Sequence, residues 1–244
     1  MDNVLVTGAS RGIGLGIAKK LAACGYRVIA VARRESAELA AAAAEAERSA
    51  AGAMRFEAFD LGEIDAISGF VAALRKRHGP LYGLVNNAAI GTEGLLANMP
   101  NAEIEALLRL NTLSPIVLTK YAVRGMMAEG RGRIVNLASI VASTGYNALS
   151  VYAATKASMV GFTKSLAREV GRVGVTVNAI APGFIDTAMT EGLAADQRKR
   201  IMDRSALRRL AEVEDVANMA AFLIGETGRN ITGAVMTVDA GNTA

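Results

Sequence analysis

The residues best suited to chemistry are Tyr152 and Lys156, four positions apart, and Ser139, thirteen residues before the tyrosine. Positions i and i+4 share one face of a helix, so the lysine ammonium would lie beside the tyrosine phenol. An ammonium favours the phenolate and lowers the phenol pKa from its ordinary value of about 10, which suits acid–base work at neutral pH. A strand-end serine can hold a substrate carbonyl by a hydrogen bond. Together these side chains indicate acid–base chemistry beside a bound carbonyl.

A second pattern lies near the start of the chain, where the apolar run Val4–Thr7 meets the glycine-rich stretch Gly8–Gly14. Gly8 to Gly12 spells G-x-S-x-G, the pattern around the nucleophilic serine of some hydrolases. That chemistry needs a histidine base, and the single histidine, His78, lies among cations before a Gly-Pro turn, as expected of a solvated helix end. We therefore interpret the stretch as a strand, a phosphate-binding turn and a helix whose free N–H groups meet a pyrophosphate.

The end of the next strand pattern indicates which dinucleotide is bound. Arg33 and Arg34 follow the apolar run Val28–Ala32, where an enzyme that prefers NAD usually has an acid for the ribose 2′-hydroxyl. A guanidinium suits a 2′-phosphate through its charge and its bidentate geometry. The two arginines therefore predict NADP(H) as the cofactor.

These residues need a scaffold that brings distant parts of the chain together. Apolar runs alternate with helical segments, and most runs are continuously apolar, as in parallel strands covered on both faces. The predicted strands are Asn3–Thr7, Arg27–Ala32, Met54–Phe59, Tyr82–Asn86, Arg133–Ala138, Val175–Ile180 and Ala234–Val238. The predicted helices are Gly12–Cys24, Ala37–Ala51, Ile64–His78, Asn101–Met127, Val151–Arg172 and Glu212–Gly225. This order predicts a Rossmann fold, a doubly wound parallel sheet of about seven strands in a three-layer α/β/α sandwich.

Length and composition bound the organisation of the chain. Its 244 residues suffice for one well-buried domain, which we expect to span 1–244. The longest break in the pattern runs from Pro182 to Leu210, and its scattered apolar residues predict short amphipathic helices, a substrate lid at about 187–210. The single Cys24, with neither a secretory leader nor a membrane-length apolar run, predicts a cytoplasmic protein with no membrane partner.

The net charge of +4 does not point to nucleic acid, because no recognised nucleic-acid motif accompanies it and only 5% of residues are aromatic. Solvated helix ends explain most basic clusters, and steering of an anionic substrate, cofactor or acidic partner is the alternative. The clusters are Arg75-Lys76-Arg77, Arg131 with Arg133, Arg198-Lys199-Arg200 and Arg208-Arg209. The sequence has no cluster of His and Cys residues, so it predicts no metal site.

Thr7-Gly8-x-x-x-Gly12-Ile13-Gly14, Ser139 and Tyr152-x-x-x-Lys156 together resemble the motifs of the classical short-chain dehydrogenase/reductase family. Asp60-Leu61, Asn86-Asn87-Ala88-Ala89 and Pro182-Gly183-Phe184-Ile185-Asp186-Thr187 are similar to further family motifs, although Ala89 replaces the usual glycine. The resemblance runs from residue 4 to about residue 240.

The resemblance implies a catalytic tetrad of Asn111, Ser139, Tyr152 and Lys156 and no metal. The Asn111 backbone carbonyl would hold a water in the proton path, and Ser139 would orient the substrate carbonyl. Tyr152 would exchange the proton, while Lys156 would bind the nicotinamide ribose and poise the tyrosine.

The resemblance also implies a set of cofactor contacts. Arg11 resembles a second basic residue of NADP-preferring members, and Ala32 stands where NAD enzymes carry Asp. The residues implied to bind NADP(H) are Gly8, Ser10, Arg11, Gly12, Ile13, Gly14, Arg33, Arg34, Asp60, Leu61, Asn87, Ala88, Tyr152, Lys156, Pro182, Gly183, Ile185 and Thr187.

Within the family, three stretches resemble 3-oxoacyl-[acyl-carrier-protein] reductases: Gly161–Glu169, Ala181–Thr190 and Ile231–Gly233. This implies NADPH-dependent reduction of a 3-oxoacyl thioester, on carrier protein or coenzyme A, to the 3-hydroxyacyl thioester of fatty acid biosynthesis, with Tyr152 as general acid. Arg131 and Arg172 are candidates for meeting an acidic carrier protein, one residue out of the usual register.

Family members are usually tetramers, which implies a homotetramer here. Two other functions stay open. One is reduction or oxidation of a different ketone or alcohol, such as a sugar, a steroid or a pathway-specific metabolite. The other is a catalytically silent NADP-binding regulatory protein.

Overall fold

The computed structural model describes residues 1–49, 51–185 and 195–244. Its centre is a sheet of seven strands, each paired in parallel with its neighbours, in the order β3-β2-β1-β4-β5-β6-β7. The strands are β1 (Asn3–Thr7), β2 (Arg27–Ala32), β3 (Ala53–Ala58), β4 (Leu81–Asn86), β5 (Gly132–Leu137), β6 (Val175–Pro182) and β7 (Val235–Val238). The chain winds outward in both directions from β1 and β4, which confirms the predicted doubly wound sheet and puts its switch point between these two strands.

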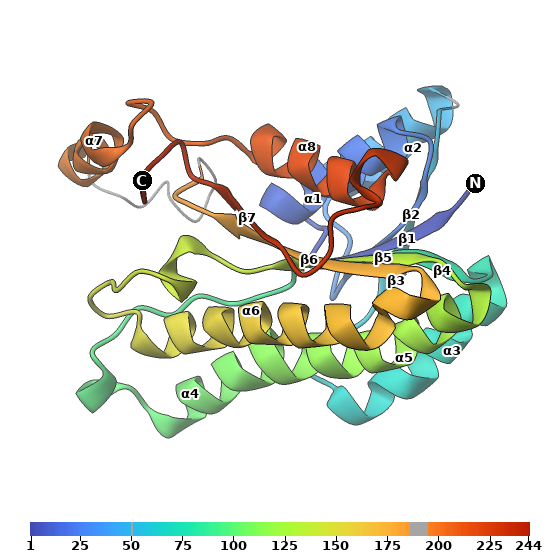
Figure 1. Cartoon of the computed structure of the whole chain (residues 1–244), viewed down its shortest axis with the longest axis horizontal. Coiled ribbons are helices and arrows are strands. Elements are labelled where there is room, and N and C mark those ends of the chain that lie inside the picture. Colours follow the sequence, from blue (N-terminus) through green and yellow to red (C-terminus); the bar gives the residue numbers. More distant parts are fainter. Residues whose placement is uncertain (50, 186–194) are drawn as a thin grey trace.

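Helices cover both faces of the sheet, as Figure 1 shows, and complete the three predicted layers. One face carries α1 (Gly12–Ala23), α2 (Ala37–Ser49) and α8 (Val213–Ile224). The other carries α3 (Ile67–His78), α5 (Ser114–Glu129) and α6 (Ser150–Val170). The remaining helices, α4 (Asn101–Leu108) and α7 (Ala195–Arg204), lie toward the edge where the strands end.

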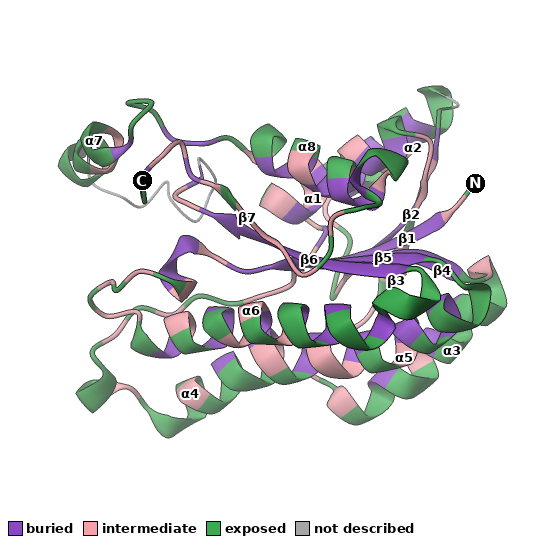
Figure 2. Cartoon of the chain, viewed as in Figure 1, coloured by how far each residue is buried: buried purple, intermediate pink, exposed green. Residues whose placement is uncertain are grey.

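Successive residues of the central strands feed two separate cores, because side chains alternate across a sheet. Val4 and Val6 of β1 belong to the core beneath α1, α2 and α8, whereas Leu5 belongs to the core beneath α3, α5 and α6. Every residue of β1, β4, β5 and β6 is buried (Figure 2), which explains why their sequences are mainly apolar rather than alternating. The outermost strand β3 instead exposes Arg55.

One predicted helix is interrupted. In place of a single helix over 101–127, α4 and α5 flank a π-helical turn at Arg109–Leu113. Pro115 supplies the physical reason, because it has no N–H to donate to the carbonyl of Asn111 four residues earlier. The turn widens the helix at this point, and such π-bulges are frequent at functional sites.

His78 also differs from expectation. It ends α3 as predicted, but it is not a solvated helix end: its side chain is only 11% exposed, and Nε2 lies 2.7 Å from Oε1 of Glu57 on β3. Arg77 pairs with the same carboxylate. His78 therefore fastens α3 to the edge of the sheet, which is a structural role.

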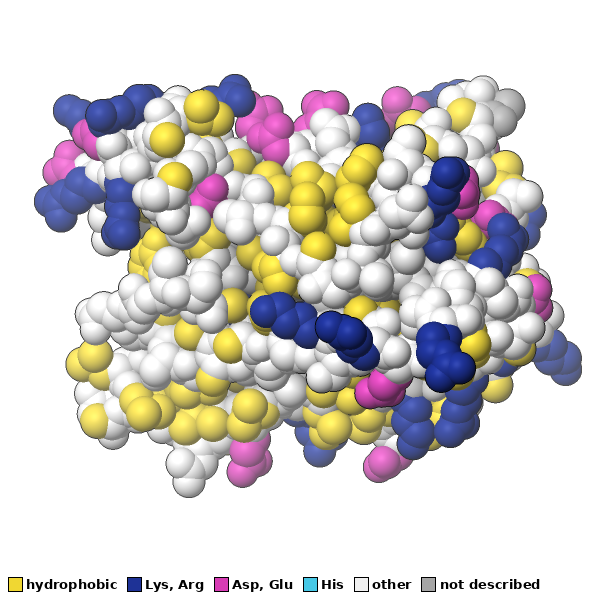
Figure 3. All heavy atoms as spheres, viewed as in Figure 1, with side chains coloured by type: hydrophobic (Ala, Val, Ile, Leu, Met, Phe, Trp, Pro, Cys, Tyr) yellow, Lys and Arg dark blue, Asp and Glu magenta, His cyan; other side chains and the backbone are white. Residues whose placement is uncertain are grey.

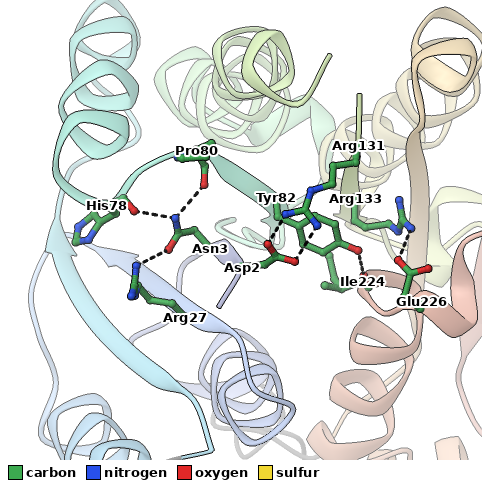
Figure 4. Close-up of polar contacts among 10 residues, drawn as sticks. All are labelled: Asp2, Asn3, Arg27, His78, Pro80, Tyr82, Arg131, Arg133, Ile224 and Glu226. Atoms are coloured by element: carbon green, nitrogen blue, oxygen red, sulfur yellow. Dashed lines mark hydrogen bonds and ion pairs between the residues drawn. The ribbon is translucent and has the colours of Figure 1, made fainter. Parts of the chain in front are cut away.

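The amino-terminal ends of the strands carry a dense set of mutually paired polar groups (Figure 4). The buried Asn3 amide donates to the carbonyls of His78 and Pro80, both at 2.9 Å. Arg131 pairs with Asp2 at 2.6 Å and Arg133 with Glu226 at 3.3 Å. The Tyr82 hydroxyl donates to the carbonyl of Ile224 at the end of α8. We call this set the amino edge.

Among the described residues, no helix combines the length and apolar character that crossing a membrane requires.

Candidate active site

The glycine turn after β1 is held by contacts that only glycine permits. Gly8 and Gly12 have φ values of +65° and +55°, in the region that disfavours other residues. A Cβ on Gly14 would lie 2.2 Å from the Gly8 carbonyl oxygen, so a larger residue there would push the turn away from α1. Around Gly12, nothing lies within 4 Å of where a Cβ would be, so the backbone is open on that side.

Asn87 and Thr7 lock this turn to the end of β4. The Thr7 hydroxyl accepts from the N–H groups of Asn87 and Ala88 at 2.9 and 3.0 Å. The Asn87 amide donates to the carbonyls of Thr7 and Gly8 at 2.8 and 3.2 Å. Asn87, predicted as a cofactor contact, thus has a definite structural task, and Ala88 lies against Gly8.

The start of α1 fits a pyrophosphate. No side chain caps its N–H groups and no acidic residue occupies its first turn, so the positive end of the helix dipole is left for an external anion. The preceding residue, Arg11, is exposed. Gly12, Ile13 and Gly14, which are predicted to bind the cofactor, form this first turn.

The arginines after β2 lie beside this turn. The Ala9 N–H donates to the Val31 carbonyl, and the Ser36 hydroxyl donates to the Ser10 carbonyl at 2.5 Å. These bonds hold the segment containing Arg33 and Arg34 against the glycine turn, and both arginines are exposed. The arrangement offers two exposed guanidinium groups beside the glycine turn, and their charge and geometry would suit a 2′-phosphate.

The other predicted cofactor residues follow the carboxyl ends of neighbouring strands. Asp60 is exposed after β3, where its carboxylate accepts from the Gly62 N–H at 2.8 Å, and Leu61 is buried. Pro182 ends β6, Gly183 donates to the Val238 carbonyl, and the buried Ile185 forms a bridge with Ala211. Thr187 lies outside the described residues, as does the start of the predicted lid region.

Ser139, Tyr152 and Lys156 come together at the carboxyl end of β5. Ser139 lies two residues past the end of the strand, where its hydroxyl accepts from the Val141 N–H at 3.4 Å and caps the 3₁₀ turn Ile140–Ala142. Tyr152 is the third residue of α6, which packs against that turn. The Lys156 ammonium lies 5.6 Å from the centre of the Tyr152 ring and donates to the Leu137 carbonyl at 2.9 Å. The structure thus brings these three residues together, as their spacing predicts.

Burial sets the protonation of this pair. Desolvation raises the pKa of Tyr152 to about 12 and lowers the pKa of Lys156 to about 8. The proximity argument predicted a lowered tyrosine pKa, and in the protein on its own the loss of hydration outweighs that attraction. At neutral pH the tyrosine is therefore a protonated phenol and the lysine a buried cation.

Asn111 lies in the π-helical turn and is 2% exposed. Its side chain clamps Ile90, accepting from the N–H at 2.9 Å and donating to the carbonyl at 2.8 Å, and it also donates to the Thr155 hydroxyl at 3.3 Å. The Asn111 side chain therefore joins the segment after β4 to α6 beside Tyr152. Its backbone carbonyl receives no hydrogen bond from residue 115, because Pro115 has no N–H.

Some residues that shape this site were not predicted. Thr155 donates to the Tyr152 carbonyl at 2.7 Å and links it to Asn111. Asn136 on β5 accepts from Asn86 at 2.8 Å and donates to Thr163 on α6 at 2.9 Å. Polar residues inside otherwise apolar strands were the available signal, because buried amides need partners.

Comparisons with known proteins match nearly the whole chain. A family model described as enoyl-(acyl carrier protein) reductase matches residues 8–243. The 3-oxoacyl-[acyl-carrier-protein] reductase FabG of Escherichia coli (strain K12) is 39% identical over 237 residues, covering 97% of this chain and 95% of that protein. The Vibrio cholerae enzyme of the same name is 38% identical over 237 residues, with the same coverage. A short chain dehydrogenase from Burkholderia cenocepacia J2315, solved in complex with NADP, is 36% identical with a TM-score of 0.91, covering 100% of this chain and 98% of that one.

Proposed function

The chain belongs to the short-chain dehydrogenase/reductase family, and from that premise we propose that it catalyses the NADPH-dependent reduction of a 3-oxoacyl thioester to the 3-hydroxyacyl thioester. The observation that carries the proposal is the buried Lys156 cation beside the Tyr152 phenol at the end of β5. Identity of 37–39% to 3-oxoacyl-[acyl-carrier-protein] reductases over almost the whole chain supports the choice of thioester.

NADPH, when bound, supplies the hydride that reduces the ketone carbon, and the protein supplies binding, orientation and a proton. The Ser139 hydroxyl would donate a hydrogen bond to the ketone oxygen and fix its orientation. Tyr152 would transfer its phenolic proton to that oxygen as negative charge develops there. A phenol with a pKa near 12 is held in the proton-donating form, which suits the direction of reduction.

Lys156 would then stabilise the phenolate that proton transfer leaves behind, because its ammonium lies 5.6 Å from the centre of that ring. The Asn111 carbonyl would hold a water that returns a proton to Tyr152 through Lys156. The ketone thus gains one hydride and one proton, and the proton comes ultimately from solvent.

The NADP(H) preference rests on charge at two places. The first turn of α1, Gly12 to Gly14 with Gly8, Ser10 and Arg11, would hold the pyrophosphate. Arg33 and Arg34 would contact the 2′-phosphate, and Asp60, Leu61, Asn87 and Ala88 would surround the adenosine and ribose. Lys156 with Pro182, Gly183, Ile185 and Thr187 would position the nicotinamide end.

The wider organisation completes the proposal. We propose one domain over 1–244, a lid at about 187–210, acyl carrier protein as partner, a cytoplasmic location and a homotetramer. The tetramer is supported by exposed apolar side chains on and beside α4 and α5, where Leu108, Leu113 and Met127 are 44%, 44% and 42% exposed. Such side chains are common at interfaces between subunits.

A substrate and cofactor panel tests the proposed function. Oxidation of NADPH and of NADH is followed by absorbance with an acetoacetyl thioester, a sugar ketone, a steroid ketone and an unrelated small ketone. We expect turnover of the thioester with NADPH at the highest kcat/KM. Turnover confined to another ketone would replace the thioester assignment, and no turnover with any would favour the non-catalytic NADP-binding protein.

A further inference from the structure

The excess positive charge of the molecule is concentrated in one short segment, residues 195–209, which comprises α7 and the turn after it. This segment has six basic and two acidic residues, so its net charge equals the +4 of the whole chain. Its basic residues are Arg198, Lys199, Arg200, Arg204, Arg208 and Arg209, and all of these except the half-buried Arg198 are exposed. Figure 3 shows their dark blue side chains gathered at the upper left, over α7.

The structure ties this segment to the active-site end of the sheet through one buried amide. The Asn242 side chain, 5% exposed, donates to the Ile201 carbonyl at 3.3 Å and to the Ser205 hydroxyl at 3.2 Å. Its oxygen accepts from the Tyr146 hydroxyl at 3.3 Å. Tyr146 belongs to the loop between Ser139 and Tyr152, so α7 is two hydrogen bonds away from the catalytic loop.

The basic residues first considered for a carrier protein lie elsewhere. Arg131 is part of the amino edge, where both of its terminal nitrogens bind Asp2, at 2.6 and 3.3 Å. Arg172 follows the last residue of α6, twenty residues after Tyr152, which is about 30 Å along a helix. Within one chain, Arg131 lies at the amino edge and Arg172 lies past the end of α6 that is opposite Tyr152, whereas α7 lies toward the edge of the sheet where the strands end (Figure 1).

From this placement we propose that the basic segment 195–209 is the docking surface for an acidic carrier protein that presents the thioester. The inference rests on the proposed function and adds the surface that recognises the carrier. The exposed cations are spread along a ten-residue helix, about 15 Å long, and beyond its end. That spread suits a row of carboxylates on a protein surface better than one small anion, which needs cations converging on a point. Opposite charge on the two partners would also speed their encounter.

The test compares substrates with and without the carrier protein. The double variant Lys199→Glu/Arg200→Glu reverses two exposed charges of the segment. Its kcat/KM is measured with a 3-oxoacyl-carrier protein, with acetoacetyl coenzyme A and with the uncharged acetoacetyl-N-acetylcysteamine. We expect the ratio of kcat/KM for the carrier-borne substrate to kcat/KM for the uncharged substrate to fall about tenfold in the variant at low salt. Added salt should lower this ratio less in the variant than in the wild type.

The matched control is Arg48→Glu/Lys76→Glu, which makes the same change of charge on exposed residues of α2 and α3. It should leave the ratio within about twofold of the wild type, a range too small to reflect docking. An equal loss in the control, or an unchanged ratio in the α7 variant, would overturn the docking surface. An equal loss with coenzyme A would overturn it in favour of a small-anion site. Failure of the wild type to reduce any of the three thioesters would overturn the proposed function itself.

Discussion

The two ends of the parallel sheet use polar groups in opposite ways. At the amino edge, Asp2, Asn3, Arg131 and Arg133 are paired with groups of the same chain (Figure 4). At the carboxyl edge, the N–H groups of α1 have no side-chain cap, and Arg33 and Arg34 contact no acidic side chain among the described residues. The same type of residue, arginine, is ion-paired within the chain at one end and exposed without an acidic partner among the described residues at the other.

This difference separates stability from function. A polar group already paired within the chain contributes to stability and has little left to offer a ligand. A helix end or a cation left unpaired retains its binding capacity for an anion. Lys156 is the extreme case, since it is buried and, among the described residues, forms no ion pair and donates to a neutral carbonyl, so its charge is available to Tyr152. Substitutions at the carboxyl edge should therefore change catalysis or binding, and those at the amino edge should change stability.

The largest effect is expected from Lys156→Met, which removes the buried cation while keeping an apolar stem. We expect kcat to fall by about 100-fold or more, because the Tyr152 phenolate loses its stabilising charge. In the wild type, kcat should decline as the pH rises through about 8, where the lysine loses its proton. Steady-state kinetics across pH 6–10 measure both, and a flat wild-type profile with an active variant would contradict the role.

Lys156 should also make the stability of the protein depend on pH, because burial disfavours its charged form. Its folded pKa of about 8 is below the ordinary 10.5, so between these pH values the unfolded chain holds a proton that the folded chain has released. Stability of the wild type relative to Lys156→Met should therefore rise from pH 8 to pH 10.5, by up to about 3 kcal/mol. Urea unfolding at several pH values checks the sign, and a relative decrease would contradict burial of the charge.

Next in size is Arg33→Ala at the carboxyl edge. Loss of a charge-assisted contact to the 2′-phosphate should raise the KM for NADPH about 10- to 100-fold and leave the KM for NADH within about twofold. The control Arg48→Ala removes an exposed arginine of α2 and should change neither value. A parallel rise for both cofactors would show that Arg33 does not recognise the 2′-phosphate.

At the amino edge, Asn3→Ala should reduce stability by about 2 kcal/mol, because the carbonyls of His78 and Pro80 both lose a buried donor. The kcat of the folded protein should stay unchanged, since Asn3 lies at the opposite end of β1 from the glycine turn. Chemical unfolding and kinetics are measured for this variant and for the control Asn230→Ala, which changes an exposed asparagine. Loss of kcat without loss of stability would break the division between the two edges.

The smallest effect is expected from Asp2→Asn. The pair with Arg131 is partly exposed, with side-chain exposures of 57% for Arg131 and 34% for Asp2. Pairs of this kind contribute at most about 1 kcal/mol and are screened by salt. The difference in unfolding free energy should therefore shrink in about 0.5 M salt, and a larger effect that is independent of salt would mean that the amino edge acts as one coupled network.

The sequence could predict most of the carboxyl edge because its chemistry is written in short local motifs. The bounds of β1 and β2 were predicted to the residue, since buried parallel strands form uninterrupted apolar runs. The π-helical turn was missed because the apolar pattern continues through it, although Pro115 was a usable signal. Asp2 and Arg131, 129 residues apart, carry no mutual pattern, so their pairing could not be predicted.

The electrostatic environment of the site was the other property that the sequence alone could not predict. The spacing of Tyr152 and Lys156 predicted their proximity, but the direction of the tyrosine pKa depends on burial, which one sequence does not show. Glu57 likewise meets His78 only because β3 and α3 pack at the edge of the sheet. Local spacing indicates which groups can react, and tertiary packing decides their protonation.

The most direct test of the central claim is to measure Tyr152→Phe for turnover and for NADPH binding in the same preparation. The substitution removes one hydroxyl and keeps the ring against Lys156. We predict a fall in kcat of about 100-fold or more for the acetoacetyl thioester, with the Kd for NADPH within about twofold of the wild type. Retention of most of the turnover would contradict Tyr152 as the proton donor.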